Sequence, residues 1–106
     1  LDEWAESYAS ADLHRYLSLY AEDFSYRGMD REQWNAFRTQ SLTQAPPREV
    51  LLEDVFLLAD PEEPDLYLAR FTQTIDYGDR SIATVKRLYW QRTSAGELVI
   101  VAEDNG

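Results

Sequence analysis

The hydrophobic pattern changes its period near Pro46 and Pro47, and this change constrains the fold more than any other feature of the chain. Before the two prolines, large apolar residues recur every three or four positions, which is the spacing of helices with one buried face. After them, apolar residues alternate with polar ones or run together, which indicates strands. Helices followed by strands predict an α+β domain built on an antiparallel sheet.

Helix starts are marked by three acidic residues that can serve as N-caps: Asp2, Asp12 and Asp30. The third forms a predicted capping box with Gln33. Residues that are mostly apolar follow each cap at helical spacing, namely Trp4, Tyr8 and Ala11, then Leu13, Tyr16, Leu17 and Tyr20, then Trp34, Phe37 and the small polar Ser41. We therefore expect three helices, the last of them ended by the prolines.

The second half of the chain predicts four strands, at Arg48–Asp60, Leu66–Tyr77, Arg80–Thr93 and Glu97–Glu103. The first carries two apolar runs, so we expect it to be largely buried on both faces. Gly78 and Asp79 form a two-residue hairpin signal between the second and third strands. A further short strand is expected near Ser25–Tyr26.

Composition narrows the class of protein. A chain of 106 residues corresponds to one domain. Its formal charge of -10 argues against nucleic acid and anionic lipid as partners. The sequence has no cysteine and a single histidine, so we expect neither a metal site nor a cofactor. No apolar run is long enough to span a membrane. Because the chain starts at Leu1, we expect it to be excised from a longer protein.

Two stretches carry a resemblance to a known superfamily. The segment "YASADLHRYLSLYAEDF", residues 8–24, resembles the opening of nuclear transport factor 2-like (NTF2-like) proteins. The resemblance implies a cone in which three N-terminal helices pack on a curved antiparallel sheet, with a pocket between them. The resemblance covers nearly the whole chain.

A narrower resemblance rests on Tyr20-x3-Phe24, Gly28 and Trp34-x3-Arg38, together with the closing "KRLYWQRTSAGELVIVAED". These residues are similar to the C-terminal accessory domain of bacterial L,D-transpeptidase-like (YkuD-type) cell-wall proteins. That group usually has an aromatic residue near position 98, where this chain has leucine. The resemblance implies a periplasmic or cell-envelope location, with the cytoplasm as the alternative.

Enzymes also occur in the superfamily, among them ketosteroid isomerases and SnoaL-like cyclases. The resemblance places the isomerase tyrosine on Trp4 and its general base on Gly28, and neither residue can do that chemistry. Isomerase activity is therefore not expected. A SnoaL-like isomerase, cyclase or hydrolase that uses another pocket carboxylate remains an alternative.

Other candidates for chemistry are His14, Asp23, Glu53 and Asp54. For each, a solvated or turn position is the preferred interpretation, because His14 lies off the apolar stripe and Asp favours turns. Lys86 and Arg87 point to opposite faces of one strand, so one of them could line the cone.

We expect a non-catalytic accessory module that binds a small molecule, a peptidoglycan fragment or other domains of its parent protein. Aromatic and arginine side chains favour such binding, and they predict a ligand site made of Trp4, Tyr8, Tyr26, Trp34, Arg38 and Tyr89. An aromatic cluster open to solvent would support ligand binding, whereas a filled cone would favour scaffolding. A third hypothesis is a homodimer joined by the outer face of the sheet, where Leu66 and Leu68 lie.

Overall fold

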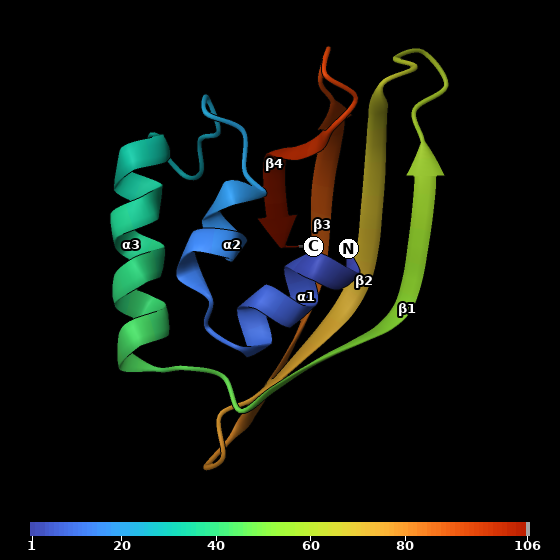
Figure 1. Cartoon of the computed structure of the whole chain (residues 1–106). Helices are drawn as coiled ribbons and strands as arrows, with labels where there is room; N and C mark the ends of the chain where they lie inside the picture. Colours follow the sequence, from blue (N-terminus) through green and yellow to red (C-terminus); the bar gives the residue numbers. More distant parts are fainter. Residues whose placement is uncertain (106) are drawn as a thin grey trace.

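A computed structural model describes residues 1–105. Over this range, three helices precede four strands: α1 (Asp2–Ala9), α2 (Leu13–Ser18), α3 (Arg31–Gln44), β1 (Glu49–Ala59), β2 (Leu66–Asp76), β3 (Ser81–Arg92) and β4 (Leu98–Asn105). The strands form one antiparallel meander in the order β1-β2-β3-β4. All three helices lie on one side of the curved sheet (Figure 1). The predicted α+β class and NTF2-like cone are confirmed.

Helix starts follow the predicted caps in two cases. The Asp12 carboxylate accepts from the Arg15 backbone N–H at 3.3 Å, and Asp30 and Gln33 form a complete capping box. The first helix differs, because Leu1 is the N-cap position and makes no side-chain cap bond. Asp2 instead lies within the first turn, where its charge favours the helix dipole.

The core fills the space between the helices and the concave face of the sheet. β2 contributes Ala69, Phe71 and Ile75 to it, and β3 contributes Leu88 and Trp90. The helices supply most of the aromatic residues: Trp4, Tyr8, Tyr16, Tyr20, Phe24 and Trp34. Phe37, expected on the inner face of α3, is 44% exposed, and Leu42 is buried in its place.

The expectation that the first strand is buried on both faces is wrong. β1 is one of the two edge strands of the sheet, and nearly all of its residues are exposed. It also bulges between Glu53 and Phe56, with Asp54 at a positive φ of 51°. A run of apolar residues has the same appearance in a doubly covered strand and in an uncovered edge strand, so periodicity could not separate the two.

The segment between α2 and α3 reverses at Gly28, whose φ of 82° suits glycine. The short strand expected near Ser25–Tyr26 is reduced to a single bridge between Tyr26 and Met29. Tyr20 forms a second bridge, parallel to Ile100 of β4. This bridge places the end of α2 along one edge of the sheet.

Candidate functional site

Arg38 lies in a pocket of aromatic rings. Its guanidinium carbon is 5.2 Å from the ring centre of Tyr8, 5.6 Å from that of Tyr16 and 5.7 Å from that of Trp34. α3 places Arg38 one turn after Trp34, and α1 and α2 bring the two tyrosines to it. The negative ring faces attract the cation, so the motif Trp34-x3-Arg38 builds a cation–π cluster.

The charge of Arg38 has no acidic partner within ion-pair distance among residues 1–105. Its Nε atom is buried and has no hydrogen-bond partner in this range, and the same holds for Trp34 Nε1. Burial acts to lower the pKa of Arg38, but the Tyr16 and Tyr8 hydroxyls act more strongly in the opposite direction, so the pKa is raised. The side chain is therefore a permanent cation whose Nε–H donor is unpaired within residues 1–105.

A hollow of about 340 Å³ opens beside this cation. It is lined by Tyr8, Arg38, Ser41, Leu42, Gln44, Ala45 and Tyr77. The hydroxyls of Tyr8 and Tyr77 and the amide of Gln44 can donate hydrogen bonds there, whereas the Ser41 hydroxyl already donates to the Phe37 carbonyl at 2.9 Å. We call this the Arg38 hollow. A cation ringed by neutral donors is suited to bind an anionic oxygen, such as that of a carboxylate.

The centre of the cone is closed by side chains. Trp4 is 0% exposed and Trp34 is 2% exposed. Trp4 packs edge-on against Tyr8 and Phe71, with ring centres 5.4 and 5.5 Å apart. Trp4, Tyr8 and Trp34 of the predicted ligand site are therefore core residues and are not open to solvent. Only the border of this site at Tyr8 and Arg38 reaches a hollow.

Tyr20 is the centre of a buried polar network. Its hydroxyl donates to Glu103 Oε1 at 2.6 Å and accepts from Trp4 Nε1 at 3.1 Å. The Tyr16 hydroxyl lies 3.1 Å away, and because Tyr20 has a single proton, Tyr16 must be the donor. Burial raises the pKa of both tyrosines. Each hydroxyl is thus held in its neutral form.

Glu103 carries the negative charge of this network. Its side chain is 3% exposed, and Lys86 Nζ lies 2.9 Å from Oε2. Sequence reasoning missed this residue, because simple alternation from Ile100 would point Glu103 away from the core. The register shift between Tyr89 and Trp90 inserts an extra residue in β4 and turns Glu103 inward.

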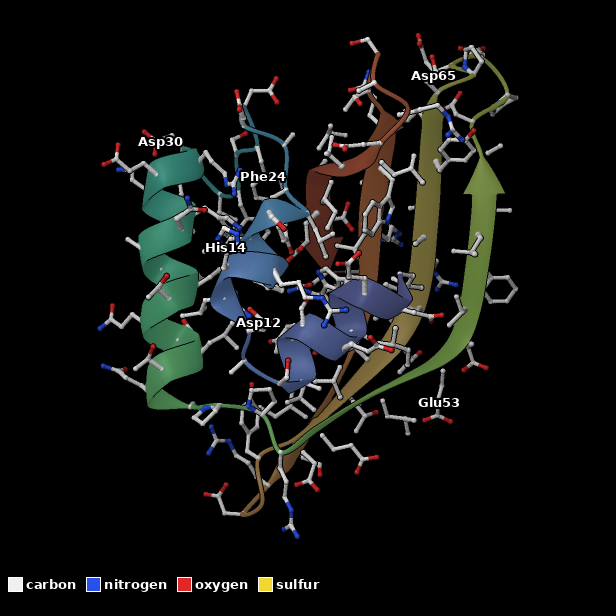
Figure 2. The ribbon with its side chains drawn as sticks, in the orientation of Figure 1. Asp12, His14, Phe24, Asp30, Glu53 and Asp65 are labelled. Atoms are coloured by element: carbon white, nitrogen blue, oxygen red, sulfur yellow. The ribbon has the colours of Figure 1, made fainter. Side chains whose placement is uncertain are left out.

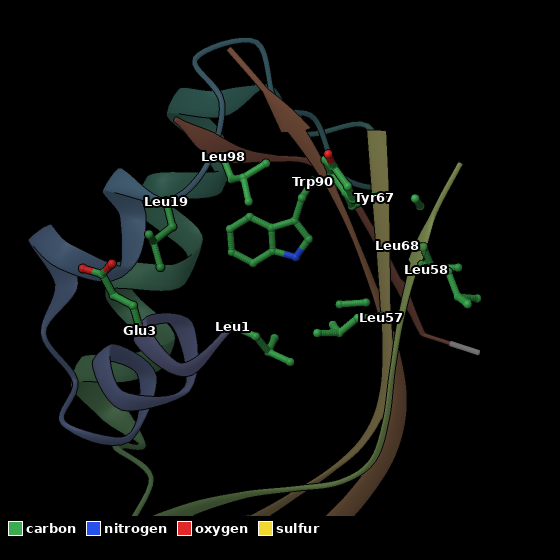
Figure 3. A pocket seen from close by; sticks show the side chains of 11 residues that line it. Leu1, Glu3, Leu19, Leu57, Leu58, Tyr67, Leu68, Trp90 and Leu98 are labelled. Carbon is green, nitrogen blue, oxygen red and sulfur yellow. The ribbon is translucent and has the colours of Figure 1, made fainter. Parts of the chain in front are cut away.

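A second hollow, of about 540 Å³, lies at the other end of the cone. Figure 3 shows Leu1, Leu19, Leu57, Trp90 and Leu98 around it. The carboxylate of Glu3 stands at its rim and pairs with Arg15 at 3.2 Å. We call this the apolar hollow. Its lining suits an apolar side chain or ring face.

The predicted ligand residues do not all come together. Trp4, Tyr8, Trp34 and Arg38 share one cluster, and Tyr26 is half-buried with its ring centre 5.1 Å from Trp34. The inward placement of Tyr89 is wrong. It pairs with Leu68 on the outer face, because Leu88 and Trp90 on either side of it point into the core.

The remaining sequence candidates lie apart from both hollows. His14, Asp23, Glu53 and Asp54 are exposed. Figure 2 shows Glu53 on the side of β1 that faces away from the helices. Within residues 1–105, no cluster of three potential metal ligands and no helix suited to cross a membrane is present.

Lys86 and Arg87 point to opposite faces, as expected. Lys86 turns inward to Glu103, whereas Arg87 pairs with Asp104 on the outer face at 3.0 Å. Lys86 therefore lies within the cone, but as part of an ion pair and outside both hollows.

Solved structures share this fold at low sequence identity. Bd1075 of Bdellovibrio bacteriovorus superimposes with a TM-score of 0.82 at 17% identity, covering 99% of this chain and 37% of that one. The helical cell shape determining protein Pgp2 of Campylobacter jejuni gives 0.80 at 21% identity, with 97% and 37% coverage. A putative ketosteroid isomerase of Parabacteroides distasonis gives 0.75 at 14% identity, with 92% and 76% coverage.

This chain thus spans little more than a third of the length of the first two proteins. No curated protein matches it. A family model does match, over residues 1–104, and describes the Cds6 C-terminal NTF2-like domain. Because the match covers almost every residue and the structure has the corresponding cone, the chain belongs to the Cds6 C-terminal NTF2-like domain family.

Proposed function

We propose that this domain is a non-catalytic accessory module that binds a carboxylate-bearing ligand, such as the peptide end of a cell-wall fragment, in the Arg38 hollow. One observation carries the proposal. In a chain with a charge of -10, the guanidinium of Arg38 lies among three rings with no acidic partner in residues 1–105. A cation left without an acid beside a hollow is suited to an anion that arrives from outside.

The context of the fold supports a cell-envelope setting. The solved structure of Pgp2 is that of a protein named for determining helical cell shape, and its similar part is a fraction of a longer chain. By this analogy, the domain is an accessory part of a larger bacterial cell-wall protein of the L,D-transpeptidase-like kind, located in the periplasm or envelope. Its role would be to hold a wall fragment for another domain.

The enzymatic alternative has weaker support. The two positions that the isomerase resemblance singles out carry Trp4, whose N–H is engaged by Tyr20, and Gly28. Glu103 is the buried carboxylate of the cone, but both its oxygens are engaged by Tyr20 and Lys86. The lining of the two hollows does not include it. A base that must reach a substrate needs access that Glu103 lacks.

A titration with N-acetyl-D-alanyl-D-alanine, followed by amide chemical shifts, tests the proposal. We expect shifts around Tyr8 and Tyr77 and a loss of binding when the carboxyl end is amidated. Arg38→Gln should weaken binding by about tenfold to a hundredfold, since hydrogen bonds to charged groups contribute about 1.5–3 kcal/mol. Arg38→Lys keeps the charge without the planar guanidinium, so its affinity should lie between those of the parent chain and Arg38→Gln.

Arg87→Gln, on the outer face, is the matched control and should bind like the parent chain. Equal binding of the acid and the amide would contradict the proposal. So would an Arg38→Gln variant that stays folded and binds unchanged. Binding of N-acetylglucosamine alone, with no effect of Arg38→Gln, would point to sugar recognition elsewhere.

A further inference from the structure

Strand β1 leaves large apolar side chains uncovered at the edge of the sheet. Leu57 is 69% exposed, Leu58 56% and Phe56 54%, although all three belong to strand β1. They lie on both faces, since Leu57 pairs with the inward Ala69 and Leu58 pairs with the outward Leu68. A long apolar edge strand of this kind is a template for pairing with another chain.

The backbone of the same stretch has free hydrogen-bonding groups. The Asp60 N–H donates to the Leu66 carbonyl at 2.9 Å. In an antiparallel pair, positions that are hydrogen-bonded to the neighbouring strand alternate with positions that are not. Counting back from Asp60, Leu58 and Phe56 lie at the positions bonded to β2. The N–H and C=O of Leu57 and Ala59 therefore point outward, away from the sheet. Strand Phe56–Ala59 presents two donors and two acceptors to an added strand.

The bulge limits the length of this template. Between Glu53 and Phe56 the register shifts, and Asp54 adopts a positive φ. Such a bulge breaks the regular spacing of edge groups. An added strand would thus align with Phe56–Ala59 and not with the whole of β1. We call Phe56–Ala59 the open edge.

The apolar hollow lies directly beside the open edge. Leu57 and Ala59 line it from β1, and Trp90 forms its floor from β3 (Figure 3). A strand added along β1 would point every second side chain toward this concave side. A hollow of about 540 Å³ can take an aliphatic or aromatic side chain.

Charge decides which kind of chain fits. Glu53 and Asp54 precede the open edge, and the turn after it carries Asp60, Glu62, Glu63 and Asp65. A second copy of this domain would bring the same acids against these and would add its own charge of -10. A partner with basic residues at both ends would instead be attracted.

We propose that the open edge binds an extended segment of a partner polypeptide as a fifth strand. The segment would place apolar side chains in the apolar hollow and lysine or arginine beside the flanking acids. Main-chain hydrogen bonds to Leu57 and Ala59 would supply affinity, while the hollow and the charges would supply specificity. This site is separate from the Arg38 hollow and does not depend on the function proposed there.

The probe is a capped heptapeptide with lysine at each end and alternating valine and threonine between. We expect saturable shifts at the Leu57 and Ala59 amides and slowed exchange of these two protons on binding. A peptide N-methylated at alternate residues cannot donate along one edge, so it should bind at least about tenfold more weakly. A peptide with glutamate ends should also lose affinity, since it meets like charges.

Ala59→Pro removes one outward N–H without touching the bonds to β2, and proline is tolerated in such an edge position. It should weaken binding to a similar degree. Leu57→Lys, which leaves the backbone free, should repel the lysine peptide and spare the glutamate one. Circular dichroism checks that both variants fold.

Two results would overturn the inference. One is equal affinity for the parent and N-methylated peptides, which would exclude strand addition. The other is a concentration-dependent dimer, measured by ultracentrifugation, that Ala59→Pro abolishes, because the occupant of the edge would then be a second copy.

Discussion

The two edges of the sheet differ in whether another segment of the chain covers them. At the β4 edge, the segment Leu19–Ala21 adds a short parallel bridge: the Ala21 N–H donates to the Ile100 carbonyl and the Ile100 N–H to the Leu19 carbonyl, both at 2.8 Å. Arg31 holds this segment by donating to the Tyr20 and Ala21 carbonyls. The chain thus covers this edge itself.

Along the open edge of β1, no segment among residues 1–105 takes that role, and the exposed side chains there are Phe56, Leu57 and Leu58, whereas the exposed acids Glu53 and Asp54 lie before it at the bulge. Edge strands in stable monomers are normally protected by charge, proline or a cover. Because the β4 edge is covered and the β1 edge is not, the exposure of apolar side chains at β1 is not a general property of the edges of this sheet. It marks the side on which a partner can extend the sheet.

The largest expected effect is a difference in the free energy of unfolding between substitutions at the two edges. Glu103→Ala, behind the covered edge, leaves Lys86 as an unpaired buried charge and should lower the free energy of unfolding by about 3–5 kcal/mol. Leu57→Ser at the open edge should change it by no more than about 0.5 kcal/mol. Urea denaturation measures both.

Asp104→Ala is the matched control, since it removes the exposed partner of Arg87 and should cost less than about 1 kcal/mol. Comparable losses for Glu103→Ala and Leu57→Ser would mean that the two edges do not differ in the way described.

The next effect is a loss of stability at alkaline pH. Burial raises the pKa of Tyr16 and Tyr20 above their ordinary value of about 10, so both stay neutral in the folded chain. Below pH 10 neither state ionises them, and their contribution is complete. Above it, the unfolded chain loses these protons first, and stability falls by about 1.4 kcal/mol per pH unit for each tyrosine.

Urea midpoints measured between pH 9 and pH 11 test this slope. Tyr16→Phe should reduce the total loss of stability across this range by about 1.4 kcal/mol, because one of the two buried hydroxyls is removed. A stability that does not change across this range would contradict the buried network around Tyr20.

Much of the fold could be predicted from local signals. The capping box at Asp30 and Gln33 and the hairpin at Gly78 and Asp79 each depend on residues close together in sequence, and both predictions are confirmed. The exposure of β1 could not be predicted, because it depends on which strand lies at the edge and on what covers it. Those are properties of the whole sheet.

The candidate site was predicted only in part. The sequence predicted that Tyr8, Trp34 and Arg38 share one site, and they lie together, with the ring of Tyr16 added to them. Glu103 was missed because a bulge changes the phase of β4. Arg31 was missed because its partners are backbone carbonyls, which leave no trace in a residue pattern.

Amide hydrogen exchange of the free chain, read residue by residue, tests the contrast between the edges most directly. We predict slow exchange for Ala21 and Ile100, whose N–H groups are bonded at the covered edge, and fast exchange for Leu57 and Ala59 at any protein concentration. Strong protection of Leu57 and Ala59 in the free chain would contradict the account, because the open edge would already be occupied.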